Sequence, residues 1–287
     1  MAAFFIHQRN LMQTRLHFAA LLFTSIAFTQ VAQADQLAAI KAKGELVCGT
    51  LGTDEPNSFI DAKSRQLVGY EVDLCRAIAQ GIGVKPVIKQ LAVAARIPEL
   101  QQGRVDILTA SLTHNKEREA LVDFSLSTFY TGQRVLVKKS SNITTVAGLA
   151  GKKVLTVKGG TQEPNIRKAV PGVDVVTFET AGQAYLGLQQ GKGVGYVDDE
   201  VSLLNNYAKL GAAQKDYLVL PQNISQEVFA FGIRKGETGV KTAVDQVLRG
   251  LEKSGEAEKL FFKWYGPTSN VKFEKRTFKI ESDKIDA

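Results

Sequence analysis

The chain has 287 residues, of which 44% are hydrophobic and 23% charged, so it is long enough for one large or two medium-sized globular domains. Its formal net charge is +7 and its pI is near 9.3, yet acids and bases are interspersed without a long basic run. A charge distribution of this kind is typical of a solvated surface and argues against a nucleic-acid partner.

Residues 1–34 have the pattern of a cleavable signal peptide. Arg9 and Arg15 form a basic segment, residues 16–29 are mostly apolar, and Ala32-Gln-Ala34 is a small-x-small cleavage site before Asp35. The alternative is a membrane anchor, but the apolar run is short for a span. No cysteine follows the predicted cut directly, which argues against a lipid anchor. The sequence therefore predicts export.

Short apolar strands alternate with amphipathic helices along the rest of the chain. Apolar residues at helical spacing predict helices at 72–82 and 240–251. The alternation predicts an α/β fold with mainly parallel sheets. The predicted strands are residues 46–49, 85–89, 105–108, 132–138, 153–157, 173–177, 193–197 and 228–234.

The chain has two cysteines, Cys48 at the end of a predicted strand and Cys75 in the predicted helix 72–82. An adjacent strand and helix can bring two Cα atoms within disulfide distance, and an oxidising compartment keeps such a bond intact. The sequence predicts a Cys48–Cys75 disulfide. Two buried free thiols are the alternative, because cysteine packs well as a small apolar residue.

The segment 111–125 has the composition of an anion-binding site. Two hydroxyl residues, Ser111 and Thr113, precede a short helical segment that carries Arg118, and Asp123-Phe-Ser125 follows. A guanidinium binds a carboxylate through parallel charge-assisted hydrogen bonds, and hydroxyls and N–H groups at a helix start satisfy the remaining lone pairs. The segment alone is weak evidence, because most such arginines are solvated surface residues.

The segment resembles the "S-x-T-x-x-x-x-R-x-x-x-x-D-F-S" pattern of the bacterial extracellular solute-binding proteins, family 3, which supply amino-acid ABC importers. The resemblance extends over nearly all of the chain after the signal peptide, and the subgroup it resembles most binds glutamate and aspartate. The other segments that carry it, in order, are 69–79 (GYEVDLCRAIA), 95–106 (ARIPELQQGRVD), 158–161 (KGGT), 190–199 (QGKGVGYVDD) and 254–259 (SGEAEK).

This resemblance implies a two-lobed type II periplasmic binding protein fold. Each lobe has a mixed, mainly parallel sheet with flanking helices, and two hinge strands join the lobes. The implied boundaries are 35–136 plus 232–265 for lobe 1, 137–231 for lobe 2, and 266–287 for a polar C-terminal tail that lies extended on the surface or is partly disordered.

The resemblance also implies how a zwitterionic ligand is bound. Arg118 corresponds to the arginine that binds the α-carboxylate, and Ser111 and Thr113 to residues that contact the same end of the ligand. Thr161 corresponds to a donor at a helix start in lobe 2, where a plain N-cap is the other interpretation. Asp199 corresponds to the acid that binds the α-ammonium, with its neighbour Asp198 as the alternative.

Side-chain specificity is less well defined by the resemblance. Arg96 corresponds to an arginine that helps to bind the distal carboxylate in the acidic-amino-acid subgroup, and a structural surface arginine is the alternative. Asp54, with Glu55, is expected at the pocket rim, where it favours a ligand with donor groups or is simply a solvated turn residue. Other determinants of the acidic subgroup are replaced here by Leu51, Val93 and Ala181.

The expected function is the periplasmic substrate-binding component of an amino-acid ABC transporter, monomeric and working with membrane permease subunits. No catalytic residue, metal or cofactor is expected: after the signal peptide only His114 remains as a histidine, and no phosphate-binding glycine loop opens a helix. Two alternatives remain open. One is a cyclohexadienyl or arogenate dehydratase on the same fold, with Asp54, Glu55 or Glu163 as the general acid; the other is a sensory ligand-binding module.

Overall fold

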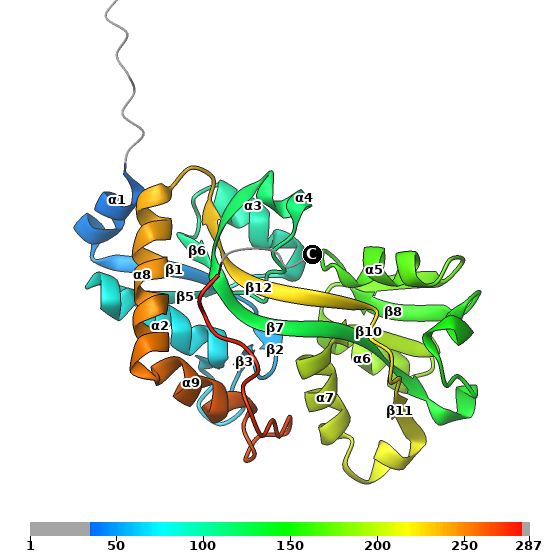
Figure 1. Ribbon diagram of the computed structural model, residues 1–287. Helices are drawn as coiled ribbons and strands as arrows, with labels where there is room; N and C mark the ends of the chain where they lie inside the picture. The colour runs from blue at the N-terminus through cyan, green and yellow to red at the C-terminus, as the bar shows by residue number, and fades with distance from the viewer. Residues whose placement is uncertain (1–34, 283–287) are drawn as a thin grey trace, which may run out of the picture. The chain divides into compact units, whose positions relative to one another are not determined.

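The computed structural model describes residues 35–282, so the predicted signal peptide lies outside the described part of the chain. The fold is the expected two-lobed α/β architecture, in which one mixed sheet passes through both lobes (Figure 1). The strands of this sheet are β1 (Glu45–Thr50), β5 (Lys85–Gln90), β6 (Ile107–Leu108), β7 (Val122–Lys138), β8 (Lys153–Val157), β9 (Asp174–Phe178), β10 (Gly195–Asp199), β11 (Tyr217–Val219) and β12 (Ser225–Arg234).

The sheet consists of two parallel groups joined by a long antiparallel pair. Its order is β5–β1–β6–β12–β7–β10–β8–β9, and β11 also pairs with β7. In the first group β1 pairs in parallel with β5 and β6, and in the second β8 pairs in parallel with β10 and β9. Between them β12 and β7 run antiparallel (Figure 1). Their pairing has register shifts between Phe229 and Gly232. The two strands therefore connect the lobes as a hinge pair.

Helices cover both groups of strands. In Figure 1, α2, α8 and α9 lie together beside β1 and β5, whereas α6 and α7 lie beside β8 and β10. A small antiparallel sheet of β2 (Thr53–Asp54), β3 (Ser58–Ile60) and β4 (Leu67–Val68) precedes α2. The helices are α1 (Gln36–Lys43), α2 (Tyr70–Ile82), α3 (Arg96–Gln101), α4 (Lys116–Glu119), α5 (Gln162–Ala169), α6 (Ala181–Gln189), α7 (Glu200–Lys209), α8 (Thr238–Ser254) and α9 (Glu256–Tyr265).

The hydrophobic core is divided largely in the same way as the sheet, except that Val201 of α7 packs in the first-lobe cluster. One cluster joins α2, α8 and α9 to the first half of β7 and includes Phe129, Phe229 and Phe261. The clusters of the second lobe are built from residues between 135 and 220, with Val135 and Leu136 of β7 on opposite sides of the sheet. Alternate residues of one strand point to opposite faces, so β7 contributes to both cores of this lobe.

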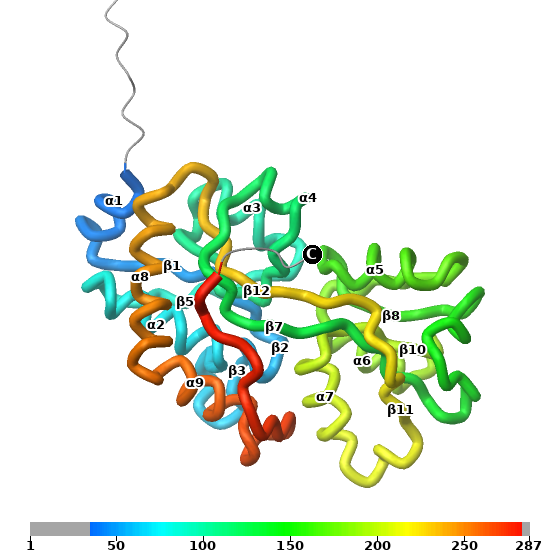
Figure 2. Tube along the Cα trace, viewed as in Figure 1, coloured from blue at the N-terminus to red at the C-terminus, as the bar shows by residue number. Residues whose placement is uncertain are grey.

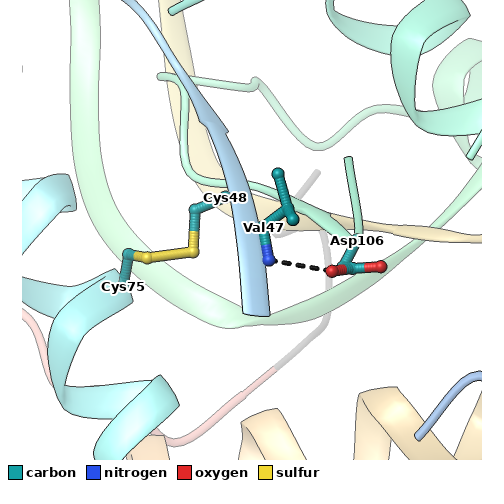
Figure 3. Close-up of a disulfide and its surroundings, with 4 residues drawn as sticks. All are labelled: Val47, Cys48, Cys75 and Asp106. Atoms are coloured by element: carbon teal, nitrogen blue, oxygen red, sulfur yellow. Dashed lines mark hydrogen bonds between the residues drawn. A yellow bond between two sulfur atoms is a disulfide. The ribbon is translucent and has the colours of Figure 1, made fainter. Parts of the chain in front are cut away.

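The predicted disulfide is confirmed. Cys48 on β1 and Cys75 on α2 are bonded, with Cα atoms 6.4 Å apart, and both side chains are fully buried (Figure 3). On the preceding residue of β1, the N–H of Val47 donates to Oδ2 of Asp106 at 2.8 Å (Figure 3). The bond thus fixes α2 to β1, the strand between β5 and β6 in the parallel group of lobe 1.

Several element bounds differ from those predicted. The strand predicted at 132–138 is the second half of the much longer β7, and the strand predicted at 105–108 is reduced to Ile107–Leu108. The predicted strand 193–197 is shifted to Gly195–Asp199, so that Asp199 ends β10 and immediately precedes α7. The hydrogen-bond pairing of the backbone determines where each strand begins and ends, and the pattern of apolar residues does not predict that pairing.

The chain after Gly266 forms an extended arm that packs along the first lobe (Figure 2). Ile280 is 1% exposed, and the carbonyl of Ser282 accepts a hydrogen bond of 2.8 Å from the N–H of Ser127 on β7. The Arg276 guanidinium donates two hydrogen bonds, of 3.0 and 2.7 Å, to the carboxylate of Glu252 on α8. Residues 267–282 therefore pack on the first lobe through hydrogen bonds and a buried side chain, as an extended arm would.

Candidate functional site

All seven residues expected to bind ligand line a single cavity of about 30 Å³. Three segments of the first lobe and three of the second contribute to it, namely 51–54, 93–96 and 111–118, and 157–162, 181 and 198–199. The strands β7 and β12 connect these two lobes (Figure 1). The lining residues are Leu51, Thr53, Asp54, Val93, Arg96, Ser111, Thr113, Arg118, Val157, Gly160, Thr161, Gln162, Ala181, Asp198 and Asp199.

Ser111 is held in an unusual backbone conformation by a buried acid. Its φ is 48°, and its N–H donates to both carboxylate oxygens of Glu71 on α2, at 2.7 and 2.9 Å. Its hydroxyl donates to Asp54 at 2.6 Å. Burial, reinforced by the charge of Asp54, raises the pKa of Glu71 to about 8. Glu71 therefore fixes the turn that carries Ser111 into the cavity.

Arg118 is positioned by the short helix α4. The Asn115 side chain caps this helix by accepting a 2.9 Å hydrogen bond from the N–H of Arg118. The guanidinium of Arg118 donates to the carbonyl of Thr113 at 3.0 Å and to that of Gly159 at 3.4 Å, and it is 9% exposed. Burial lowers its pKa, against the opposing charges of Glu227 and Asp199. Within residues 35–282 it hydrogen-bonds no carboxylate, so N–H donors remain for an anion.

Arg96 is bound to backbone carbonyls on three sides. Nε donates to Val93 at 2.9 Å, and Nη1 donates to Ala110 and Ser111 at 2.8 Å each. Nη2 donates to Gly159, in the other lobe, at 3.1 Å. The residue is 3% exposed, and burial, with the nearby charge of Arg118, lowers its pKa to about 9. Arg96 is thus buried and ties together the backbone around the cavity, in contrast to a structural surface arginine.

Thr161 occupies the N-cap position of α5, but its hydroxyl makes no capping hydrogen bond. It lies 3.3 Å from Oγ1 of Thr113, accepts from Nε2 of Gln133 at 2.8 Å and donates to Oε2 of Glu227 at 3.2 Å. The hydroxyl therefore faces the other lobe and the hinge strands. The side chain of Thr161 therefore does not act as a plain N-cap of α5.

Asp198 and Asp199 differ in how many hydrogen bonds their carboxylate oxygens accept. Asp198 accepts from the Tyr196 hydroxyl, from the N–H of Asp199 at 2.9 Å and from Nε2 of Gln162. Oδ2 of Asp199 accepts from Gln162 at 3.3 Å, whereas its buried Oδ1 has no hydrogen-bond partner within residues 35–282. Burial, followed by the charges of Asp198 and Glu227, raises the pKa of Asp199. Asp199 is therefore the acid with a free acceptor for a cationic group.

Asp54 is buried, so it is not a solvated turn residue. It is 9% exposed, and its carboxylate accepts from Asn57 at 3.0 Å, from Ser111 at 2.6 Å and from Ser202 of α7 at 2.5 Å. The neighbouring Glu55 is partly exposed and forms an ion pair with Lys209. Two adjacent residues of the first lobe thus contact the same helix of the second.

Several polar residues of the site were not anticipated from the sequence. Glu71, Gln133, Gln162 and Glu227 are each 5% exposed or less, and they hold Ser111, Thr161 or Asp199 through side-chain hydrogen bonds. Glu71 lies within the quoted segment 69–79 and Gln162 directly follows Thr161, so both were next to recognised motifs. Gln133 and Glu227 lie on the hinge strands, where sequence gives no sign that a side chain faces the cavity.

The described part of the chain offers little for metal or histidine chemistry. Within residues 35–282 no group of three or more His, Cys, Asp or Glu side chains is placed to hold a metal ion. His114 is 4% exposed, stacks on Phe124 with ring centroids 4.1 Å apart, and does not line the cavity. In the same range, no helix has the length and apolar character that a membrane span requires.

A cavity with separate cationic and anionic groups, set between two α/β lobes, is the architecture of a solute-binding protein. Residues 46–267 match the profile of the bacterial extracellular solute-binding proteins, family 3, and the chain belongs to this family.

Relatives with named ligands cover most of the chain. The glutamine-binding protein GlnH of an ABC transporter in Bacillus subtilis is 31% identical over 80% of this chain and 84% of its own length. The L-glutamate/L-aspartate-binding protein of Pseudomonas aeruginosa is 30% identical, over 79% and 78% respectively. Among solved structures, the ancestral amino acid-binding protein AncCDT-1, a precursor of cyclohexadienyl dehydratase, is 31% identical, covers 80% of this chain and 100% of its own, and has a TM-score of 0.72.

Proposed function

We propose that this protein is the periplasmic substrate-binding component of an amino-acid ABC transporter. Its relatives are named as amino-acid-binding proteins, and the family is extracellular. The protein acts as a monomer that captures a polar amino acid and presents it to the permease subunits in the membrane. Residues 1–34 are the export signal and are removed.

The observation that carries this proposal is the convergence of Arg118 and Asp199 on one cavity. Arg118 keeps guanidinium donors free for the α-carboxylate, with Ser111, Thr113 and Thr161 beside it. Asp199 keeps Oδ1 free for the α-ammonium. Buried charges are costly unless paired, so a zwitterion that supplies both partners is favoured over water in this site.

The proposed lobes are residues 35–136 with 232–265, and residues 137–231. The core clusters support this division, because the buried residues of the second-lobe clusters all lie between 135 and 220. Val201 of α7 packs in the first-lobe cluster and so links the two lobes. A ligand that contacts both lobes shifts the population towards the closed arrangement, which is the form a permease can recognise.

A thermal-shift screen against the common amino acids tests the function. Ligand binding to the native state raises the Tm by mass action. We expect a shift with at least one amino acid, and we expect Arg118→Ala to abolish it, because the α-carboxylate would lose its charged partner. Arg104→Ala, which removes an exposed arginine paired with Glu99, is the matched control and should leave the shift unchanged.

The screen also distinguishes the enzyme and sensor alternatives. Arogenate and prephenate are included, and their turnover would contradict a pure binding function in favour of a dehydratase. A protein that shows no shift with any amino acid would also contradict the proposal. Binding in Arg118→Ala within about threefold of the unaltered protein would show that the cavity is not the ligand site.

A further inference from the structure

Two cavities meet at Asp54. The first is the ligand cavity of about 30 Å³, and the second, of about 200 Å³, lies between the β2–β3 region and α7. Four residues line both: Thr53, Asp54, Ala181 and Asp198. We call the second cavity the α7 chamber; its other lining residues are Gly52, Glu55, Phe59, Ile60, Ser202, Asn206 and Lys209. Since one water needs about 10–15 Å³ on this scale, the chamber has room for a ligand side chain.

The carboxylate of Asp54 stands between the two cavities without a cationic partner. Oδ1 accepts from the Ser202 hydroxyl and Oδ2 from Ser111 and Asn57, and all three donors are neutral. Among the ion pairs within residues 35–282, none includes Asp54, which is 9% exposed. A buried carboxylate held only by neutral donors gains most from a cation brought within contact distance.

The charges around the α7 chamber favour such a cation. Its acids are Asp54, Glu55 and Asp198, and its only lysine, Lys209, is bound to Glu55. Burial raises the pKa of Asp198 to about 7, and the charge of the neighbouring Asp54 adds to this effect. An incoming carboxylate would add to this repulsion, whereas an ammonium or guanidinium group would relieve it.

Arg96 is the residue expected to bind a distal carboxylate, but few of its guanidinium N–H donors are free to bind a ligand. Nε and both N–H groups of Nη1 are occupied by the carbonyls of Val93, Ala110 and Ser111. Nη2 donates to the carbonyl of Gly159. Two parallel hydrogen bonds from Arg96 to a second carboxylate would therefore require breaking contacts that hold the cavity together. Phe59 and Ile60, in contrast, give the chamber an apolar wall suited to a methylene stem.

We propose that the bound amino acid extends its side chain past Asp54 into the α7 chamber and ends there in a cationic group. The ligands are then basic amino acids. The cationic group of the ligand binds the carboxylate of Asp54 and takes the position of the Ser202 hydroxyl, which donates to this carboxylate here. Arg96 is a positioning residue for the Ala110–Ser111 backbone. This inference rests on the proposed binding function and adds the ligand class to it.

Calorimetric titration of the purified protein with arginine, lysine, glutamine and glutamate tests the inference. We expect arginine or lysine to bind at least about tenfold more tightly than glutamate. Asp54→Asn should weaken that binding by about tenfold or more while changing glutamine affinity by less than about threefold. The charge is lost, whereas the amide oxygen can still accept from Ser111 and Asn57 and the amide NH2 can donate to the Ser202 hydroxyl. Asp61→Asn, the same change in a nearby exposed turn outside both cavities, should alter neither.

A second variant keeps the test decisive if Asp54→Asn fails to fold. Asn206→Leu leaves Asp54 intact and changes a residue that lines the chamber but not the ligand cavity, so it should weaken the basic ligand and spare a short amino acid such as serine. The inference is overturned if glutamate or glutamine binds most tightly, or if Asn206→Leu weakens all ligands equally; the proposed binding function would survive both results. If no amino acid binds at all, both are wrong.

Discussion

Nη2 of Arg96 donates a hydrogen bond of 3.1 Å to the carbonyl oxygen of Gly159, and this contact joins α3 of the first lobe to the turn after β8 in the second. The approach requires a glycine. At residue 159 φ is +82°, and a Cβ there would lie 2.6 Å from Cα of Ala94. Since that atom belongs to the backbone, it cannot move aside as a side-chain tip would. The close contact of the lobes beside the ligand cavity therefore depends on Gly159.

Gly159→Ala should weaken ligand binding by about tenfold or more without unfolding the protein. The added methyl group prevents the turn from reaching Ala94 and Arg96, so the ligand loses part of its contact with one lobe. Calorimetric titration with the ligand identified by the screen measures the effect.

Gly172→Ala is the matched control for this prediction. Gly172 has the same φ of +82°, but nothing lies within 4 Å of the position that its Cβ would occupy. Both variants carry the penalty of a left-handed alanine, about 1–2 kcal/mol, so both should melt at a lower temperature. Only Gly159→Ala should lose affinity, and an equal loss in both would contradict the steric explanation.

The second prediction concerns the pH dependence of stability. The pKa of Glu71 is raised from 4.5 to about 8, chiefly by burial, so its neutral form is the one that the fold favours. Its contribution to stability is complete below about pH 4.5 and is lost as the pH rises through about 8. Glu71→Gln, which stays neutral, should therefore melt above the unaltered protein at about pH 9, by about 3 °C or more, and the difference should shrink towards pH 6.

Thermal melts across this pH range give the comparison directly. Glu179→Gln provides the control, because Glu179 is an exposed carboxylate paired only with Lys158 at 3.5 Å. Its melting temperature should follow that of the unaltered protein at every pH. A Glu71→Gln difference that does not change with pH would mean that Glu71 is ionised throughout the range.

The sequence motifs predicted the location of the site more accurately than the contacts that its individual residues make. The segments 95–106 and 111–125 and the isolated motifs around Thr161 and Asp199 were sufficient to name six residues that line one cavity, and the resemblance as a whole added Asp54. Each motif is short and its chemistry is local, so spacing alone preserves it. The same is true of the Cys48–Cys75 bond, which needs only an adjacent strand and helix.

The remaining features depend on contacts between distant segments. Asp54 was expected at a rim, but Ser202, far away in sequence on α7, covers its carboxylate. Arg96 lines the cavity as expected, but nothing in the sequence indicates that the carbonyls of Ala110 and Ser111 accept from its Nη1 group. Glu227 reaches Thr161 only because β12 pairs with β7 across the hinge. No local pattern encodes which of several polar side chains will satisfy one another.

The third prediction concerns the disulfide. It closes a separation of 27 residues, and the entropy of such a loop corresponds to a stabilisation of about 3 kcal/mol. Replacing Cys48 and Cys75 by alanine should lower the Tm by about 6–12 °C and leave ligand affinity within about threefold, because neither residue lines the ligand cavity.

Chemical reduction distinguishes the stability that the covalent bond contributes from the stability that packing of the two sulfur atoms contributes. Unaltered protein that is refolded under reducing conditions should lose most of the same stability, whereas the double alanine variant should not respond to reductant. A finding of two free thiols in protein exported to an oxidising compartment would contradict the expected bond.

The last prediction concerns the C-terminal arm, which lies mostly beyond the family-matched residues 46–267. Glu252 on α8 is its main anchor, because it accepts from both the Arg276 guanidinium and, at 3.0 Å, the N–H of Ile280. Burial alone would raise the pKa of Glu252, but these hydrogen bonds outweigh it and lower the pKa below 4.5. The contribution of this anchor is thus present above about pH 4.5 and is lost as the pH falls through the lowered value.

Glu252→Gln should reproduce the effect of acid at neutral pH, since it removes the charge while keeping the length of the side chain. Hydrogen exchange should become faster at the N–H groups of Ile280 and Ser127, which bond the anchor and the arm, and stay unchanged in the second lobe. Glu258→Gln, a change at an exposed residue of α9, should leave both amides protected. If the Ile280 amide keeps its protection in Glu252→Gln, then the packing of Ile280 and Phe278 against Phe129 and Phe261, and not the charged anchor, holds the arm in place.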